Sequence, residues 1–331
     1  MKKKVHGADV TRFLNSRYWL TANIVAFIAV LSVIPALLPA IDLSAGPLGL
    51  KPPSAWIQSP SLDEIAGISA TIAIAATLYL INTTYNVIRS LSLVYASVFI
   101  TAMMVMPDIT KGLDSPLVLA LAVLASLLPM FSTYQSPNST RRIFLTFAIV
   151  STAMAFTCQL SAWIALTLVL LAAVAQMRIL ELRSIMAAFI GLATPLWIMW
   201  GFGLTGTLTL TPPTSFTLTT WPAWLTPVSA TCVGTTILLW LILSSANLLR
   251  IYNYNARLRA YNGVFTLLGL FLLLLMAIDF GNVPLYMPLM AACLGLQAGH
   301  FFTINHGPRS WIGIIAVSIP YWALIVWQYM S

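Results

Sequence analysis

Charged side chains are scarce in this chain, and the positive ones recur at every second break between apolar segments. Of its 331 residues, 16 are Lys or Arg and 8 are Asp or Glu, so charged residues make up 7% and hydrophobic residues 60%. Soluble domains carry about 25% charged residues. So few charges cannot cover a water-exposed surface of this size. The sequence therefore predicts a protein embedded in a lipid bilayer.

The basic residues are distributed asymmetrically along the chain. Fourteen of the 16 lie at the N-terminus or in alternate breaks: Lys2, Lys3, Lys4, Arg12, Arg17, Arg89, Arg141, Arg142, Arg178, Arg183, Arg250, Arg257, Arg259 and Arg309. The intervening breaks carry most of the acids: Asp42, Asp63, Glu64, Asp108, Asp114 and Asp279. Cytoplasmic loops are enriched in Lys and Arg, so this alternation predicts a cytoplasmic N-terminus and a periplasmic C-terminus. Anionic lipid headgroups and insertion bias account for the net charge of +8, and we expect no nucleic-acid partner.

The apolar segments have the length of membrane spans, which need about 20 residues. Helices are predicted over residues 19–41, 64–84, 91–107, 115–134, 143–177 (as two helices), 184–203, 228–250, 261–278, 284–303 and 310–329. The run 143–177 is too long for one span, and the polar break at Gln159–Ser161 divides it into two short helices. We therefore expect an all-α, polytopic transmembrane helical bundle of about 11 spans, forming one integral membrane domain over residues 1–331.

One outer loop has a pattern of its own. Residues 204–227 are uncharged, and Thr alternates with other residues on both sides of Pro212–Pro213. Alternation with a period of two around a turn predicts a short periplasmic β-hairpin near residues 205–220. The alternative is an irregular Thr-rich loop.

The three cysteines, Cys158, Cys232 and Cys293, lie in apolar segments without metal-ligand spacing. We interpret them as small buried apolar residues, and we expect neither a metal site nor a cofactor. Cys158 and Cys232 both fall near the outer ends of their predicted helices. A disulfide between them is therefore left open.

Asp63 and Glu64 are the candidate catalytic residues. Adjacent acids at the outer mouth of the second predicted helix can bind a metal or act as a general base on a lipid-linked sugar. The alternative is a capping box, in which Ser61 caps the helix, Glu64 completes the box, and both acids favour the positive end of the helix dipole. The sequence leaves both interpretations open.

Candidate substrate-binding or partner-binding residues lie near the cytoplasmic ends of the late helices. Gln297 and His300 are one turn apart on the helix predicted over 284–303, and each needs a partner inside the bundle. Arg250, Arg257 and Arg259 alternate with tyrosines in one cytoplasmic loop, a pattern that suits a membrane surface, a phosphate headgroup or a protein partner. A packed histidine and purely topological arginines are the alternatives.

Three stretches carry a resemblance to a known family: Arg142–Phe144, Arg183–Trp197 with its segment Gly191–Pro195, and Val283–Phe302. Together they resemble a family of uncharacterised polytopic inner-membrane proteins of Bacteroidota. The resemblance implies a multi-pass protein of a Gram-negative inner membrane with work related to the cell envelope. The family has no assigned activity to carry over.

Three function hypotheses follow. The first is a non-enzymatic inner-membrane component of envelope biogenesis, such as an assembly or partner subunit, with membrane lipids and a protein of an envelope complex as partners. The second is a membrane glycosyltransferase or flippase for polyprenyl-linked glycans, with Asp63 and Glu64 at its outer mouth. The third is a small-solute transporter. No charged residue lies in the middle of a predicted span, which disfavours an ion pump.

Overall fold

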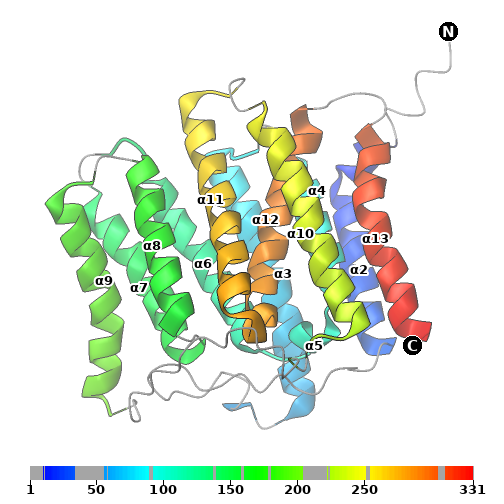
Figure 1. The fold of residues 1–331 in the computed structure, drawn as a ribbon, viewed down its shortest axis with the longest axis horizontal. Helices are drawn as coiled ribbons and strands as arrows, with labels where there is room; N and C mark the ends of the chain where they lie inside the picture. The colour runs from blue at the N-terminus through cyan, green and yellow to red at the C-terminus, as the bar shows by residue number, and fades with distance from the viewer. Residues whose placement is uncertain are drawn as a thin grey trace.

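The computed structural model describes residues 10, 12–33, 56–57, 59–88, 92–136, 139–157, 160–177, 180–203, 222, 224–250, 254–304 and 310–330. Helices are the regular elements of this part of the chain (Figure 1). They are α2 (Arg17–Val33), α3 (Pro60–Tyr85), α4 (Val94–Met104), α5 (Pro107–Thr110), α6 (Ser115–Phe131), α7 (Thr140–Thr157), α8 (Leu160–Met177), α9 (Leu182–Gly201), α10 (Pro227–Leu248), α11 (Ala256–Ile278), the 3-10 helix η3 (Phe280–Asn282), α12 (Val283–Ile304) and α13 (Ser310–Met330).

The predicted division of residues 143–177 into two helices is confirmed, since α7 ends at Thr157 and α8 begins at Leu160. The break lies slightly earlier than predicted, because Leu160 and Ser161 belong to α8. The helix predicted over 91–107 was too long, because α4 ends at Met104. Pro107 explains the early end: proline disfavours the helical conformation of the residue before it, and α5 starts anew at Pro107.

The helix predicted over 261–278 was too short, because α11 already begins at Ala256. The Asn255 side chain caps this helix by accepting a hydrogen bond from the Leu258 N–H at 3.1 Å. Residues 34–41 of the first predicted helix and the hairpin predicted near 205–220 lie outside the described residues.

Within the described residues, six helical segments are long and apolar enough to cross a membrane: Pro60–Tyr85, Leu182–Gly201, Pro227–Leu248, Ala256–Ile278, Phe280–Thr303 and Ser310–Met330. The protein is therefore a multi-pass membrane protein. Further apolar helices, such as α2, α4 and α6, are shorter than about 20 residues. By this criterion the described residues contain six spans, and the number of 11 stays a prediction.

Helix α12 lies at the centre of the bundle. Of its apolar window, 94% is buried inside the protein, compared with 28% for α9. Helices α4, α6, α10 and α11 pack around α12, and every residue of α4 is buried. At the opposite extreme, α9 packs on α7 at one edge of the molecule (Figure 1). A helix that is apolar on all sides suits either place, surrounded by protein or facing lipid.

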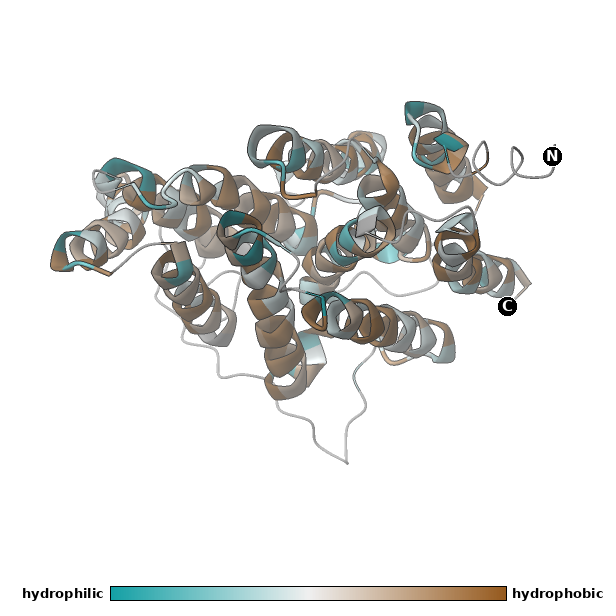
Figure 2. Cartoon of the chain, turned by 90° about the horizontal axis from the view of Figure 1, so that it is seen from above, coloured by the Kyte–Doolittle hydropathy of each residue, from teal (hydrophilic) through white to brown (hydrophobic). Residues whose placement is uncertain are grey.

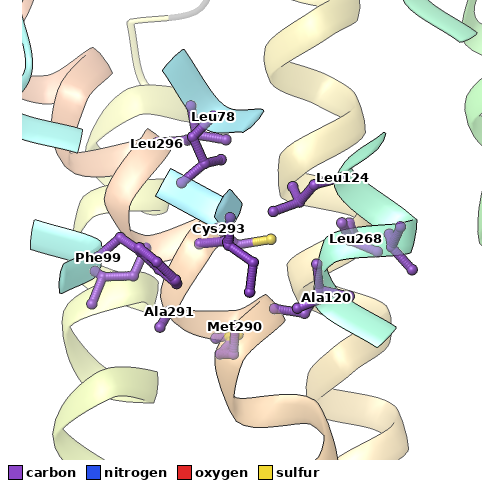
Figure 3. Packing of buried hydrophobic residues seen from close by; sticks show 14 of the residues in the cluster. Leu78, Phe99, Ala120, Leu124, Leu268, Met290, Ala291, Cys293 and Leu296 are labelled. Carbon is purple, nitrogen blue, oxygen red and sulfur yellow. The ribbon is translucent and has the colours of Figure 1, made fainter. Parts of the chain in front are cut away.

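The middle of the bundle is a closely packed apolar layer. Figure 3 shows Leu78 of α3, Phe99 of α4, Leu124 of α6 and Leu268 of α11 around Cys293 of α12. Each of these side chains is at most 1% exposed. This layer separates the polar groups at the two ends of the bundle.

The two ends of the bundle differ in charge. Helices α7, α9 and α11 begin at the upper end in Figure 1, and their first turns carry Arg142, Arg183 and Arg257. Helix α5 and the start of α3 lie at the lower end, with Asp63 and Asp108. Seen from above, hydrophilic residues gather at helix ends and hydrophobic ones cover the walls (Figure 2). We call these the basic end and the acidic end.

Candidate functional site

A cluster of buried polar side chains lies between α10, α11 and α12 near the basic end. The Gln297 Nε2 donates to Asn262 Oδ1 at 3.1 Å and to Thr266 Oγ1 at 3.2 Å. The Asn247 Nδ2 donates to Gln297 Oε1 at 2.7 Å and to the Gln297 carbonyl oxygen at 2.9 Å. Gln297, Asn247 and Asn262 are each at most 1% exposed. Gln297 thus joins three helices in the bundle interior.

His300 extends this cluster towards the basic end. It lies one turn after Gln297 on the same face of α12, and it is 2% exposed. Its ring packs edge-on against Tyr254, with the ring centroids 5.8 Å apart. Together, Asn247, Tyr254, Asn262, Thr266, Gln297 and His300 form what we call the inner polar cluster.

The inner polar cluster keeps hydrogen-bonding capacity. Within the described residues, the Asn247 Oδ1, Asn262 Nδ2, His300 Nε2 and Tyr254 hydroxyl have no hydrogen-bond partner. Leaving a buried polar group unsatisfied costs about 1–3 kcal/mol. Burial raises the pKa of Tyr254, and the nearby Arg250 lowers it in part, so the phenol stays neutral at physiological pH. The cluster therefore offers donors and acceptors to an uncharged polar group.

The structure brings together some of the predicted binding residues. Gln297 and His300 are both in the inner polar cluster, and Arg250 acts electrostatically on its Tyr254. Arg257 instead donates from Nε to the Tyr261 hydroxyl at 2.8 Å, facing α6. Arg250, Arg257 and Arg259 are all exposed at the rim.

Asn262 and Thr266 were not among the binding residues predicted from the sequence. Their spacing of four residues places them on one face of α11, and this was the available signal. In an otherwise apolar helix, two polar residues at this spacing indicate a polar contact with a neighbouring helix.

A second site lies at the acidic end. A cavity of about 310 Å³ opens there between α4, α5, α10, α12 and α13. Its walls are mainly apolar, and polar side chains also contribute. The lining residues are Val105, Met106, Asp108, Ile109, Trp224, Thr226, Pro227, Val228, Ser229, Cys232, Val233, Pro284, Met287, Trp327 and Gln328. We call this the outer cavity, and its volume is at the lower end of the range for small-molecule sites, about 300–1,000 Å³.

Hydrogen bonds between helices hold the walls of the outer cavity. The Trp224 Nε1 donates to the Phe280 carbonyl oxygen at 2.9 Å, which ties the start of α10 to η3. The Gln328 Nε2 donates to the Val105 carbonyl oxygen at 3.0 Å, which ties α13 to the end of α4. Thr226 and Ser229 form a capping box at the start of α10. The cavity is therefore built from fixed elements.

Asp63 lies at the same end and fastens a loop. Its Oδ1 accepts a hydrogen bond at 2.9 Å from the Leu113 N–H, 50 residues further along the chain. A Cβ added to Gly112 would lie 2.8 Å from Asp63 Oδ2 and 3.2 Å from Asp114 Oδ2. Asp63 thus joins the first turn of α3 to the segment before α6, while Glu64 is half-buried.

The capping box considered for Ser61 and Glu64 was wrong. Helix α3 begins at Pro60, with Ser59 as its N-cap and without a side-chain capping bond. Proline at the first helical position explains the earlier start, because its missing N–H would have been unpaired there. Neither this start nor the Leu113 contact tests the catalytic role of Asp63 and Glu64, which stays a prediction.

Two substitutions separate a structural from a chemical role of Asp63. Asp63→Ala removes the acceptor of the Leu113 N–H, and we expect it to lower the free energy of unfolding by about 1–2 kcal/mol. Asp63→Asn keeps an oxygen acceptor and removes the charge, so its free energy of unfolding should equal that of the wild type. Thermal unfolding in detergent and cellular function are the measurements. Loss of function in the stable Asp63→Asn variant would establish a chemical role, and full function in it would leave only the structural one.

Asp279 is a buried carboxylate at the turn between α11 and α12. It is 0% exposed and accepts hydrogen bonds from the Tyr286 hydroxyl at 2.8 Å and from Asn282 Nδ2 at 2.9 Å. These contacts hold the chain reversal between α11 and α12, where Asp, Gly and Asn residues favour a turn.

Among the described residues, no group of three or more His, Cys, Asp or Glu side chains could hold a metal ion. Cys232 and Cys293 are free, buried thiols, and Cys232 lines the outer cavity. Cys158, the other half of the disulfide left open by the sequence, lies outside the described residues.

Comparison of the chain with protein-family models, curated proteins and solved structures finds no match. The resemblance to inner-membrane proteins of Bacteroidota therefore stays a prediction from the sequence.

Proposed function

We propose that this protein is an inner-membrane component of envelope biogenesis that binds the hydrocarbon part of a lipid or lipid-linked glycan in the outer cavity. The amphipathic lining of that cavity carries the proposal. Val228, Val233 and Met287 offer apolar walls, and Asp108 and Ser229 offer polar atoms in the same space. A hydrocarbon chain fits apolar walls at membrane depth, and its headgroup can then meet the polar atoms.

The charge pattern supports the proposed orientation. Cytoplasmic segments of membrane proteins are rich in Lys and Arg, so the basic end faces the cytoplasm in this proposal. The outer cavity then opens near the periplasmic leaflet, where lipid-linked precursors of envelope polymers are used.

The first role that we propose is a non-enzymatic assembly or partner subunit, and the contact of the Asp63 carboxylate is compatible with it. A structural bond to the Leu113 N–H already accounts for this carboxylate. The glycosyltransferase or flippase hypothesis has one observation in its favour: Asp108 lines the outer cavity and lies on α5, next to the loop that Asp63 fastens. The packed apolar layer around Cys293 gives the small-solute transporter hypothesis no support.

The outer cavity can be filled by substitution. Val233→Trp places an indole in the cavity, whereas Ile190→Trp adds one to the exposed face of α9 as a control. Each protein is purified in mild detergent from native membranes, and mass spectrometry measures the retained lipids and proteins. We expect wild type and Ile190→Trp to retain one lipid species. Val233→Trp should retain about tenfold less of this lipid, since the lipid's hydrocarbon chain loses the apolar contact area that binds it.

The identity of the retained molecule separates the roles. A polyprenyl-phosphate species without a protein partner would favour the glycan hypothesis, and a stoichiometric protein partner together with the lipid would favour the assembly subunit. Equal lipid retention in wild type and Val233→Trp would refute the proposed use of the outer cavity.

A further inference from the structure

Two arginines from different helices converge on the end of α6, at the basic end. The Arg142 Nη1 donates to the Ser132 carbonyl oxygen at 2.6 Å. Arg257 donates from Nε to the Tyr261 hydroxyl, and that hydroxyl donates to the Phe131 carbonyl oxygen at 3.2 Å. Arg142 is thus anchored directly to the Ser132 carbonyl group, and Arg257 is anchored through Tyr261 to the neighbouring Phe131 carbonyl group. The two arginines are 115 positions apart in the sequence (257 − 142).

An aromatic floor fixes the position of Arg257. Its guanidinium carbon lies 5.4 Å from the centroid of the Tyr261 ring, within the range of a cation–π contact. Tyr261 is 0% exposed and packs against the rings of Tyr85, Phe131 and Tyr134, with centroids 5.9, 4.6 and 5.9 Å away. Arg257 is therefore held before any ligand arrives, which lowers the entropy cost of binding.

Both guanidinium groups act on the same neighbour. Arg142 and Arg257 each interact electrostatically with the Tyr85 hydroxyl, and the carbonyl groups at which their contacts end, those of Ser132 and Phe131, are consecutive in the chain. Two cations at one place repel each other, and an anion between them would turn this repulsion into attraction. From the charge pattern of the sequence, 14 basic residues belong to the side of the basic end. The only acids that the pattern assigns to this side are Asp9 and Glu181.

Anchoring to α6 does not use up these arginines. A guanidinium has five N–H groups in a planar fork that matches a phosphate. Arg142 and Arg257 each use one nitrogen for the anchoring bond, and both residues are exposed at the basic end. The remaining N–H groups can therefore point to a ligand at the level of lipid headgroups.

We propose that Arg142 and Arg257 form a binding site for a phosphate group at the basic end of the bundle. The phosphate of an anionic phospholipid headgroup and a soluble phosphate share this chemistry. Neither the outer cavity nor the function proposed for it enters this inference, since the two sites lie at opposite ends of the bundle.

The chain supplies a matched control for the test. Arg141 and Arg259 are also exposed. Arg141 is next to Arg142 in the sequence, and Arg259 is two residues after Arg257. The double variants Arg142→Gln/Arg257→Gln and Arg141→Gln/Arg259→Gln therefore remove the same charge from the same helix starts. Any difference between them reports the site and not the general charge of the surface.

The experiment titrates dioleoylphosphatidylglycerol into the full-length protein in a neutral detergent and counts bound lipid by native mass spectrometry. We expect Arg142→Gln/Arg257→Gln to weaken binding at least about tenfold, because charge-assisted hydrogen bonds are lost. The Arg141→Gln/Arg259→Gln variant should change it by less than about twofold, which is the scale of surface charge effects. Dioleoylphosphatidylcholine, which has no net charge, should bind weakly to all three proteins.

Two further measurements identify the source of the phosphate and test whether the variants are folded. Displacement of the lipid by millimolar inorganic phosphate would assign the site to a soluble phosphate, and its absence to the lipid headgroup. Arg142→Lys/Arg257→Lys keeps the charge and loses the planar fork, so it should bind less tightly than wild type while unfolding at the same temperature. Equal losses in the two Gln variants, or no loss in either, would overturn the proposal.

Discussion

Replacing Gly295 with alanine is expected to destabilise the protein by about 2–3 kcal/mol, because it overpacks the contact between α4 and α12. An added Cβ would lie 2.4 Å from the Tyr95 carbonyl oxygen and 3.4 Å from the Phe99 Cβ. The nearest atom belongs to the backbone of a helix that is buried throughout, so it cannot rotate away. Small residues permit such close approach between helices in membranes.

Gly234→Ala is the matched control for Gly295→Ala. Gly234 lies on α10, and an added Cβ would meet nothing within 4 Å. Alanine should be neutral or slightly stabilising there, since glycine costs about 1 kcal/mol relative to alanine in a helix interior. Thermal unfolding in detergent and the yield of monodisperse protein measure both variants. Equal stability of the two would contradict the close packing of α4 on α12.

Replacing Gln297 with leucine is expected to lower the free energy of unfolding by about 2 kcal/mol or more, from unsatisfied buried groups at about 1–3 kcal/mol each. The substitution removes the acceptor Oε1 from Asn247 and the donor Nε2 from Asn262 and Thr266. All of these groups are buried where water cannot replace the lost partner. The measurement is the unfolding temperature of the purified protein.

Removing the whole network separates stability from function. In the triple variant Asn247→Leu/Asn262→Leu/Gln297→Leu, no buried amide is left without its partner, and stability should return towards wild type. A stable triple variant that fails to support function in cells would show that the inner polar cluster acts in the protein's work. A triple variant less stable than Gln297→Leu would contradict this account, because the network would then contribute net stability.

The sequence predicted which kinds of residue form the candidate site, but not which contacts each of them makes. Gln297 and His300 were selected because polar residues near the end of an apolar helix need partners, and both are buried in one cluster with Asn247. Arg257 was expected to bind with Arg250 and Arg259, yet its side chain turns to Tyr261 and the end of α6. Rotation of a side chain about its helix depends on the neighbouring helix, which the loop sequence does not encode.

The sequence by itself determined that this protein is helical and crosses the membrane several times, and it located the break between α7 and α8. Apolar length, proline positions and charge are local properties, so they can be seen in a single segment. Only the tertiary structure decided that Asp63 holds the Leu113 N–H, that the contacts of Arg142 and Arg257 both end at the C-terminal end of α6, and that a cavity opens beside Asp108. Helices that are apolar on every side carry no periodic signal of which face meets which neighbour, so these contacts come from packing alone.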